Sequence, residues 1–142
     1  MATFEKVVKS KLEIELQRIA SSYGFSPRIL SVDDVNPLLV TMEAVDGKTI
    51  FALHSDDAKK VPGWIWQRIV HILLVLYERE GIEYVDITSF NFMVVVSGSE
   101  PEVKIIDFGD AYYTKKMRGE RPKNWALAKV LDGERIWNAD FR

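Results

Sequence analysis

The stretch Val103-Lys104-Ile105-Ile106-Asp107-Phe108-Gly109 joins an apolar run to an acidic turn. The apolar run is typical of a short buried strand. Gly109 allows the chain to turn sharply just after Asp107. A second apolar run, Phe92–Val96, precedes it across the turn-forming sequence Ser97–Pro101. We therefore expect a β-hairpin that carries Asp107 at its end.

A polar segment, Asp86-Ile87-Thr88-Ser89-Phe90-Asn91, begins twenty-one residues before Asp107. It follows a periodic pattern that predicts a long helix from about Trp64 to Arg79, ended by Gly81. The stripe expected to face inward is Ile65, Ile69, Ile72, Leu73 and Leu76. The predicted order is therefore a helix, an acidic loop and a hairpin.

These polar residues are of the types that phosphoryl transfer requires. Asp107 offers a carboxylate to a metal that bridges phosphate oxygens, and Asn91 offers a neutral oxygen to a second magnesium ion. Asp86 is placed to accept the proton of an attacking hydroxyl. In the alternative interpretation, Asp86 caps a turn, Asn91 satisfies loop backbone and Asp107 merely ends a hairpin. The joint order and spacing favour the functional interpretation.

This arrangement resembles protein kinases of the eukaryotic Ser/Thr type, over roughly Glu5–Tyr113. The segment Arg68–Asn91 resembles their long helix and catalytic loop, and Asp107-Phe108-Gly109 matches their D-F-G motif. Their usual H-R-D reads Tyr84-Val85-Asp86 here, and casein-kinase-type enzymes also have Tyr in the first position. The usual Arg pairs with a phosphorylated activation segment, so Val85 implies that no such switch operates. The resemblance implies an α+β, kinase-like remnant with Asp86 as base and Asn91 and Asp107 as Mg²⁺ ligands.

Upstream, periodicity predicts a helix over Phe4–Tyr23 and strands over Arg28–Val32 and Leu38–Glu43. The helix resembles the one that carries the lysine-pairing glutamate of kinases, with Glu15 as the best match and Glu13 second. The segment Met42–Val45 resembles the hinge. The resemblance therefore implies nucleotide contacts at Glu43 and Val45.

Two parts of a kinase have no match in this interpretation. The glycine-rich loop and the strand-three lysine do not fit before Glu15, because fourteen residues cannot form three strands ahead of the helix. Lys6, Lys9 and Lys11 fall on the same predicted helix as Glu15. Lys11 and Glu15 are expected to form only a surface pair. No A-P-E follows the D-F-G, and a short helix over Trp125–Leu131 is all that is expected near the end. We expect one truncated domain, with a small-lobe part over 1–50 and a large-lobe part over 51–142.

Faces that the missing elements would cover should be apolar and need another cover. Trp64, Trp66, Trp125 and Trp137 are candidates for such faces, and core filling is the alternative. We expect a protein partner, such as a kinase, or self-association as a dimer. The basic stretch Lys115–Lys123 fits either a site for phosphate or an acidic partner, or a solvated segment.

Composition limits the remaining classes. The 142 residues carry a formal net charge of −2, so neither nucleic acid nor a membrane is expected as a partner. The absence of cysteine excludes disulfides and thiolate metal sites. The charged N-terminal residues do not resemble a signal peptide, so we expect an intracellular, cytoplasmic protein.

Two functions follow from these observations. The first is a pseudokinase-type regulator that acts by binding proteins and retains some affinity for Mg²⁺ and ATP. The second is a minimal ATP-dependent phosphotransferase that uses Asp86, Asn91 and Asp107. The glycine-rich loop and the lysine missing from this interpretation favour the regulator, and the intact acidic groups favour the enzyme.

Overall fold

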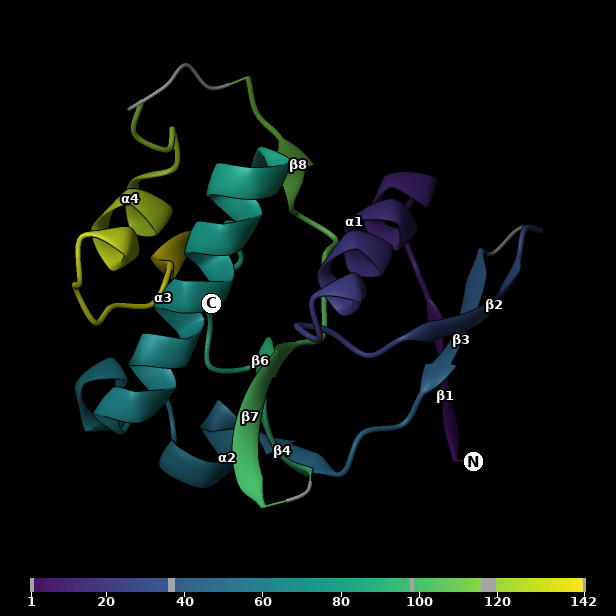
Figure 1. Ribbon diagram of the computed structural model, residues 1–142, viewed down its shortest axis with the longest axis horizontal. Coiled ribbons are helices and arrows are strands. Elements are labelled where there is room, and N and C mark those ends of the chain that lie inside the picture. The colour runs from purple at the N-terminus through teal and green to yellow at the C-terminus, as the bar shows by residue number, and fades with distance from the viewer. Residues whose placement is uncertain (1, 36–37, 98, 116–119, 142) are drawn as a thin grey trace.

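A computed structural model describes residues 2–35, 38–97, 99–115 and 120–141 (Figure 1). The chain is a mixed α+β protein with antiparallel sheets. A three-stranded sheet lies on one side, and a larger assembly surrounds the long helix α3, Gly63–Glu80. The predicted α+β class is confirmed.

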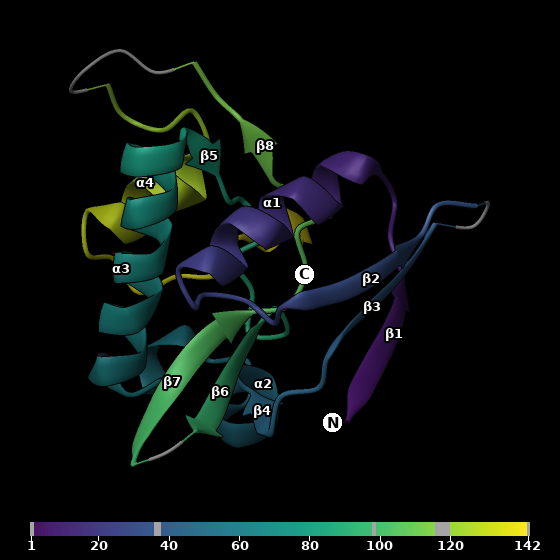
Figure 2. The same ribbon diagram turned by 45° about the vertical axis from the view of Figure 1, so that its right-hand side comes forward.

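The smaller part contains β1 (Thr3–Val7), α1 (Lys11–Ser22), β2 (Ile29–Asp33) and β3 (Leu39–Glu43). Its antiparallel sheet has the order β1-β3-β2, and α1 runs beside it (Figure 2). A small core is buried there, made of Val8, Ile14, Val40 and Met42. The middle strand β3 thus supplies two of its four members.

The helix predicted over Phe4–Tyr23 is wrong in its first third. The helix begins after Ser10, whose side chain accepts a hydrogen bond from the Glu13 amide and so caps it. The residues before Ser10 pair with β3, with Lys6 opposite Val40. Their apolar spacing fits either a helix or a strand, and pairing with β3 decides the outcome.

The larger part is built on α3, for which the sequence prediction is confirmed. All five residues of the predicted inward stripe are buried. Gly81 follows the last turn with φ of 65°, a left-handed conformation that suits glycine. Before α3 come a short helix α2 (Ile50–His54) and a 3₁₀ turn (Ala58–Lys60), which is capped by the Asp57 side chain.

A second sheet has the order β4-β6-β7 and carries the predicted hairpin. β6 (Phe92–Ser97) and β7 (Glu100–Ile105) are antiparallel, while β4 is Gly47–Thr49. Beyond the last ladder pair, the Ile106 amide donates to the Asn91 carbonyl at 3.0 Å. This bond holds Asn91 beside the residue that directly precedes Asp107.

The remaining elements are short. β5 (Ile82–Glu83) pairs with β8 (Tyr112–Tyr113), and α4 occupies Trp125–Leu131 as expected. A 3₁₀ turn over Ala139–Phe141 follows. Part of the basic stretch Lys115–Lys123 lies outside the described residues, so its two interpretations stay open.

The helix α1 connects the two parts. Leu16 and Ala20 belong to the core of the larger part. After the helix, the Phe25 carbonyl accepts the Ile105 amide at 2.8 Å, and the Ser26 hydroxyl donates to the Ile105 carbonyl at 2.9 Å. The end of β7 is therefore fixed against the turn after α1.

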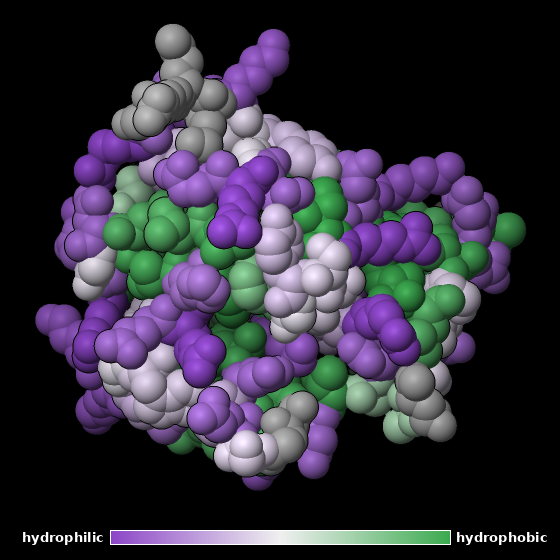
Figure 3. Space-filling view, in the orientation of Figure 1, coloured by the Kyte–Doolittle hydropathy of each residue, from purple (hydrophilic) through white to green (hydrophobic). Residues whose placement is uncertain are grey.

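The four tryptophans divide evenly between core and surface. Trp66 and Trp137 are buried, with ring centroids 4.7 Å apart. Trp64 and Trp125 are exposed. The visible face shows apolar side chains in separate areas between hydrophilic ones (Figure 3). No helix in the described part of the chain is long and apolar enough to cross a membrane.

Candidate functional site

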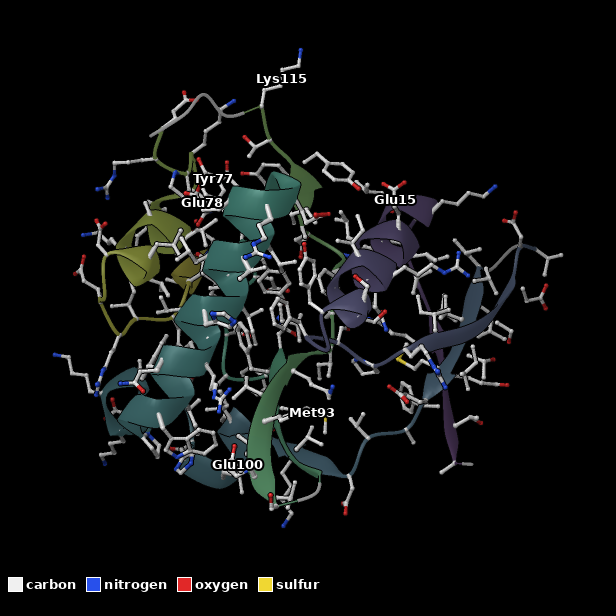
Figure 4. The ribbon with its side chains drawn as sticks, viewed as in Figure 1. Glu15, Tyr77, Glu78, Met93, Glu100 and Lys115 are labelled. Atoms are coloured by element: carbon white, nitrogen blue, oxygen red, sulfur yellow. The ribbon has the colours of Figure 1, made fainter. Side chains whose placement is uncertain are left out.

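A cavity of about 430 Å³ lies between the two parts, a size typical of small-molecule sites. It is lined from the smaller part by Phe4, Lys6, Pro27, Met42, Glu43, Ala44 and Val45, and from the larger part by Asn91, Met93, Ile106 and Asp107. Met93 projects from β6 (Figure 4). The cavity thus combines mostly apolar walls with a few polar groups at one end. A larger hollow between α1 and β2, about 650 Å³, contains neither Asn91 nor Asp107. Asp86 lines neither of these two cavities.

Lys6 lies at the polar end of the cavity and contacts two carboxylates. Its Nζ is 3.2 Å from Glu13 Oε1 and 3.6 Å from Asp107 Oδ1. The lysine side chain is 23% exposed and that of Glu13 only 3%, so this ion pair is shielded from water on one side. The prediction that Lys6 lies on the helix is therefore wrong. Lys6 reaches the cavity because it lies on a strand.

Glu13 pairs with Lys6 and also forms a hydrogen bond with the segment that connects β1 to α1. Its second oxygen, Oε2, accepts the Lys9 amide at 3.0 Å. Glu15 instead projects toward β8, where Oε2 accepts the Tyr113 hydroxyl at 2.8 Å (Figure 4). Lys11 pairs with Asp34 at 3.0 Å and not with Glu15. Of the two glutamates, Glu13 is the one that pairs with a lysine, Lys6, in the described part of the structure.

Asp107 has one carboxylate oxygen engaged and one available. Oδ1 accepts the Gly109 amide at 2.8 Å. Oδ2 has no partner among the residues that the structure describes, and the side chain is 40% exposed. A Cβ at position 109 would lie 3.1 Å from Asp107 Oδ1, so glycine permits this close approach.

Tyr84 fastens the loop before Asp86 to the end of β7. Its hydroxyl donates to the Asp107 carbonyl at 2.6 Å, and its ring meets those of Phe92 and Phe108 edge-on. Burial, followed by the charge of Asp86, raises the pKa of Tyr84. The phenol therefore stays protonated and remains a donor at neutral pH.

Asp86 is nearly buried, and its Oδ1 has no hydrogen-bond partner in the described structure. Burial, and next the charge of Asp107, raises its pKa from 3.8 to about 6. A base with a pKa near the working pH is suited to general base catalysis.

Asn91 is tied to the same loop. Its Nδ2 donates to the Asp86 carbonyl at 3.1 Å, which leaves Oδ1 without a partner among the described residues. The side-chain oxygens open to a metal are therefore Asn91 Oδ1 and Asp107 Oδ2. No group of three or more His, Asp or Glu suited to a metal exists in the described part. Mg²⁺ commonly takes one or two protein ligands and completes its shell with phosphate and water, so this donor pair fits.

The two hinge candidates differ in what they can offer. The carboxylate of Glu43 accepts the Arg28 amide at 2.9 Å and so braces β3 against the chain leading into β2. The Ala44 amide donates to the Ala2 carbonyl at 3.1 Å. Val45 also lines the cavity, and its amide has no partner within the described residues.

No protein-family model and no curated protein matches this chain. The case for a function therefore rests on the geometry of the cavity. Sequence reasoning missed Lys6, although Ser10 with an acidic residue three positions later is a signal for a helix start. If the helix starts there, the residues before it can form a strand, and Phe4 and Lys6 then lie on the same face of that strand.

Proposed function

We propose that this protein binds Mg²⁺–ATP in the cavity between its two parts and transfers the terminal phosphate, as a small kinase-like phosphotransferase. The observation that carries the proposal is the position of Lys6 between Glu13 and Asp107. A lysine fixed by a helix glutamate and set beside a metal-binding aspartate is the phosphate grip of kinases. The expected absence of this lysine and of a glycine-rich loop is the reason to prefer a regulator without activity.

Each polar group then has a role. Lys6 binds phosphate oxygens, and Glu13 holds its ammonium group in place. Asn91 and Asp107 hold magnesium, which neutralises charge on the phosphates. Asp86 accepts the proton of the substrate hydroxyl, for which its raised pKa of about 6 is suitable.

The apolar walls suit a planar base. Phe4 and Met42 from the sheet, with Met93 and Ile106 from the larger part, would enclose an adenine ring. The free Val45 amide would donate a hydrogen bond to its edge. Apolar enclosure with a few directed polar groups is the usual design of nucleotide pockets.

Thermal unfolding with ATP tests the binding step. We expect ATP with Mg²⁺ to raise the melting temperature of the wild type, and Asp107→Asn to abolish the Mg²⁺-dependent part of the rise. Asp33→Asn, on the exposed face of β2, is the matched control and should keep the full shift. No shift at millimolar ATP in the wild type would contradict the proposal.

A second candidate function is regulation by protein binding. Phe4 and Val7 are 57% and 58% exposed on β1, which is the edge strand of its sheet. An exposed edge strand can pair with a strand of another chain. Mass measurement in solution tests self-association. A monomer at high micromolar concentration would count against a dimer formed through this edge.

A further inference from the structure

Three successive carbonyl groups around Asp86 are each held by an asparagine. The Val85 carbonyl accepts a hydrogen bond from the side-chain Nδ2 of Asn138 at 2.6 Å. The Ile87 carbonyl accepts one from the backbone N–H of Asn138 at 2.8 Å. The Asp86 carbonyl between them accepts Asn91 Nδ2, as described above. Asn138, although distant in the sequence, thus forms hydrogen bonds with the backbone on both sides of Asp86.

Asn138 is itself fixed. It is fully buried, and its Oδ1 accepts the Asp140 amide at 3.1 Å, which agrees with Nδ2 facing the Val85 carbonyl. The preceding residue, Trp137, packs on Trp66. The Trp66 indole nitrogen donates to the Ala58 carbonyl at 2.9 Å. The segment is therefore anchored to α3 before it reaches the loop.

We propose that Asn138 is a positioning residue, which fixes the backbone on both sides of Asp86 and so holds its carboxylate in a catalytic orientation. This inference rests on the proposed function, because it takes Asp86 as the base. Val85 and Ile87 are buried and apolar, so their side chains cannot fix the loop through charge. Asn138 fixes the loop through hydrogen bonds instead, and these need no modification of the protein.

One oxygen of the Asp86 carboxylate, Oδ1, has no hydrogen bond in the described structure, and the Asn91 side chain is the hydrogen-bond partner of the carboxylate. The direction of the carboxylate therefore depends on the backbone around Asp86 as well as on Asn91. Catalytic groups must be held within roughly 0.5 Å of their working position. Loss of the bond to the Val85 carbonyl frees the peptide unit that leads into Asp86. The chemical step should slow, while nucleotide binding should not change.

The test uses Asn138→Asp, which keeps the size of the side chain and an acceptor for the Asp140 amide but cannot donate to the Val85 carbonyl. We expect kcat to fall at least tenfold, with KM for ATP and Kd for Mg²⁺–ADP unchanged within twofold. The structural control is Asn124→Ala, which removes the cap of α4. It should lower the melting temperature with little change in kcat.

An unchanged kcat in Asn138→Asp would overturn the proposal. So would a loss of kcat that Asn124→Ala reproduces at the same melting temperature, since that indicates a merely structural role.

If the wild type neither binds Mg²⁺–ATP nor transfers phosphate, the proposed function fails, and amide hydrogen exchange still tests whether Asn138 fixes the loop. Exchange over residues 84–91 should then be at least tenfold faster in Asn138→Asp and unchanged in Asn124→Ala. Equal exchange in Asn138→Asp and the wild type would refute this role of Asn138.

Discussion

The ammonium group of Lys6 lies 3.6 Å from the carboxylate of Asp107, although the two residues are far apart in the sequence. Lys6 lies on the edge strand of the smaller part, and Asp107 follows the last strand of the larger hairpin. Their contact depends on how α1 and the turn after it position the β1-β3-β2 sheet relative to β7. The cavity is therefore a product of the whole fold.

Glu13→Gln should destabilise the protein. The substitution leaves the half-shielded Lys6 without its buried partner, which we expect to cost about 1–3 kcal/mol of unfolding free energy. Urea denaturation at pH 7 measures it. Glu15→Gln is the control, because Glu15 makes only an exposed bond to Tyr113 and should change stability by less than about 0.5 kcal/mol. Equal effects at the two positions would contradict the assigned pairing.

Asp86 should make stability fall as the pH rises. Its pKa in the folded protein is about 6, above the ordinary 3.8, so the native state holds the proton more tightly than the unfolded chain. Its stabilising effect is present below about pH 4 and lost by about pH 6. Asp86→Asn should therefore gain up to about 3 kcal/mol relative to wild type between pH 4 and pH 7. Unfolding curves at both pH values measure this, and Asp33→Asn should show no such gain.

Gly109→Ala should weaken metal–nucleotide binding more than it affects folding. The added Cβ would meet Asp107 Oδ1 at 3.1 Å and displace the carboxylate that faces the cavity. We expect several-fold weaker binding of Mg²⁺–ADP by calorimetry. At Gly63 an added Cβ meets only the end of the Arg135 side chain, so Gly63→Ala is the control. Unaltered affinity in Gly109→Ala would argue against Asp107 as a metal ligand.

Trp137→Ala should be among the most damaging changes in the tail. Removal of a buried aromatic side chain costs about 3–5 kcal/mol, and here it also removes the contact with Trp66. Trp125 is 44% exposed, so Trp125→Ala should cost less than about 1 kcal/mol. Thermal unfolding of both variants makes the comparison. Similar losses would mean that the tail does not pack as described.

The sequence predicted the larger part well because its signals are local. The stripe of α3, the glycine that ends it and the β6–β7 hairpin all follow from residue spacing. The helix Trp125–Leu131 was also predicted with its observed bounds. These elements place Asp86, Asn91 and Asp107 near one another, as expected.

The remainder depended on contacts between distant segments. Residues 4–7 fit two periodicities, and only the free edge of β3 selects the strand that carries Lys6. The choice between Glu13 and Glu15 needs the direction of α1 relative to that strand. Asn138 has no local signal at all, since its partners are the carbonyls of Val85 and Ile87.

Calorimetric titration of Mg²⁺–ADP into wild type, Lys6→Met and Lys11→Met tests the central claim most directly. Lys11 pairs only with the exposed Asp34, so it is a matched control for the loss of one charge. We predict saturable binding to the wild type, at least tenfold weaker binding to Lys6→Met, and unchanged binding to Lys11→Met. Absence of binding at millimolar nucleotide, or equal affinity in all three proteins, would contradict a phosphate grip built on Lys6, Glu13 and Asp107.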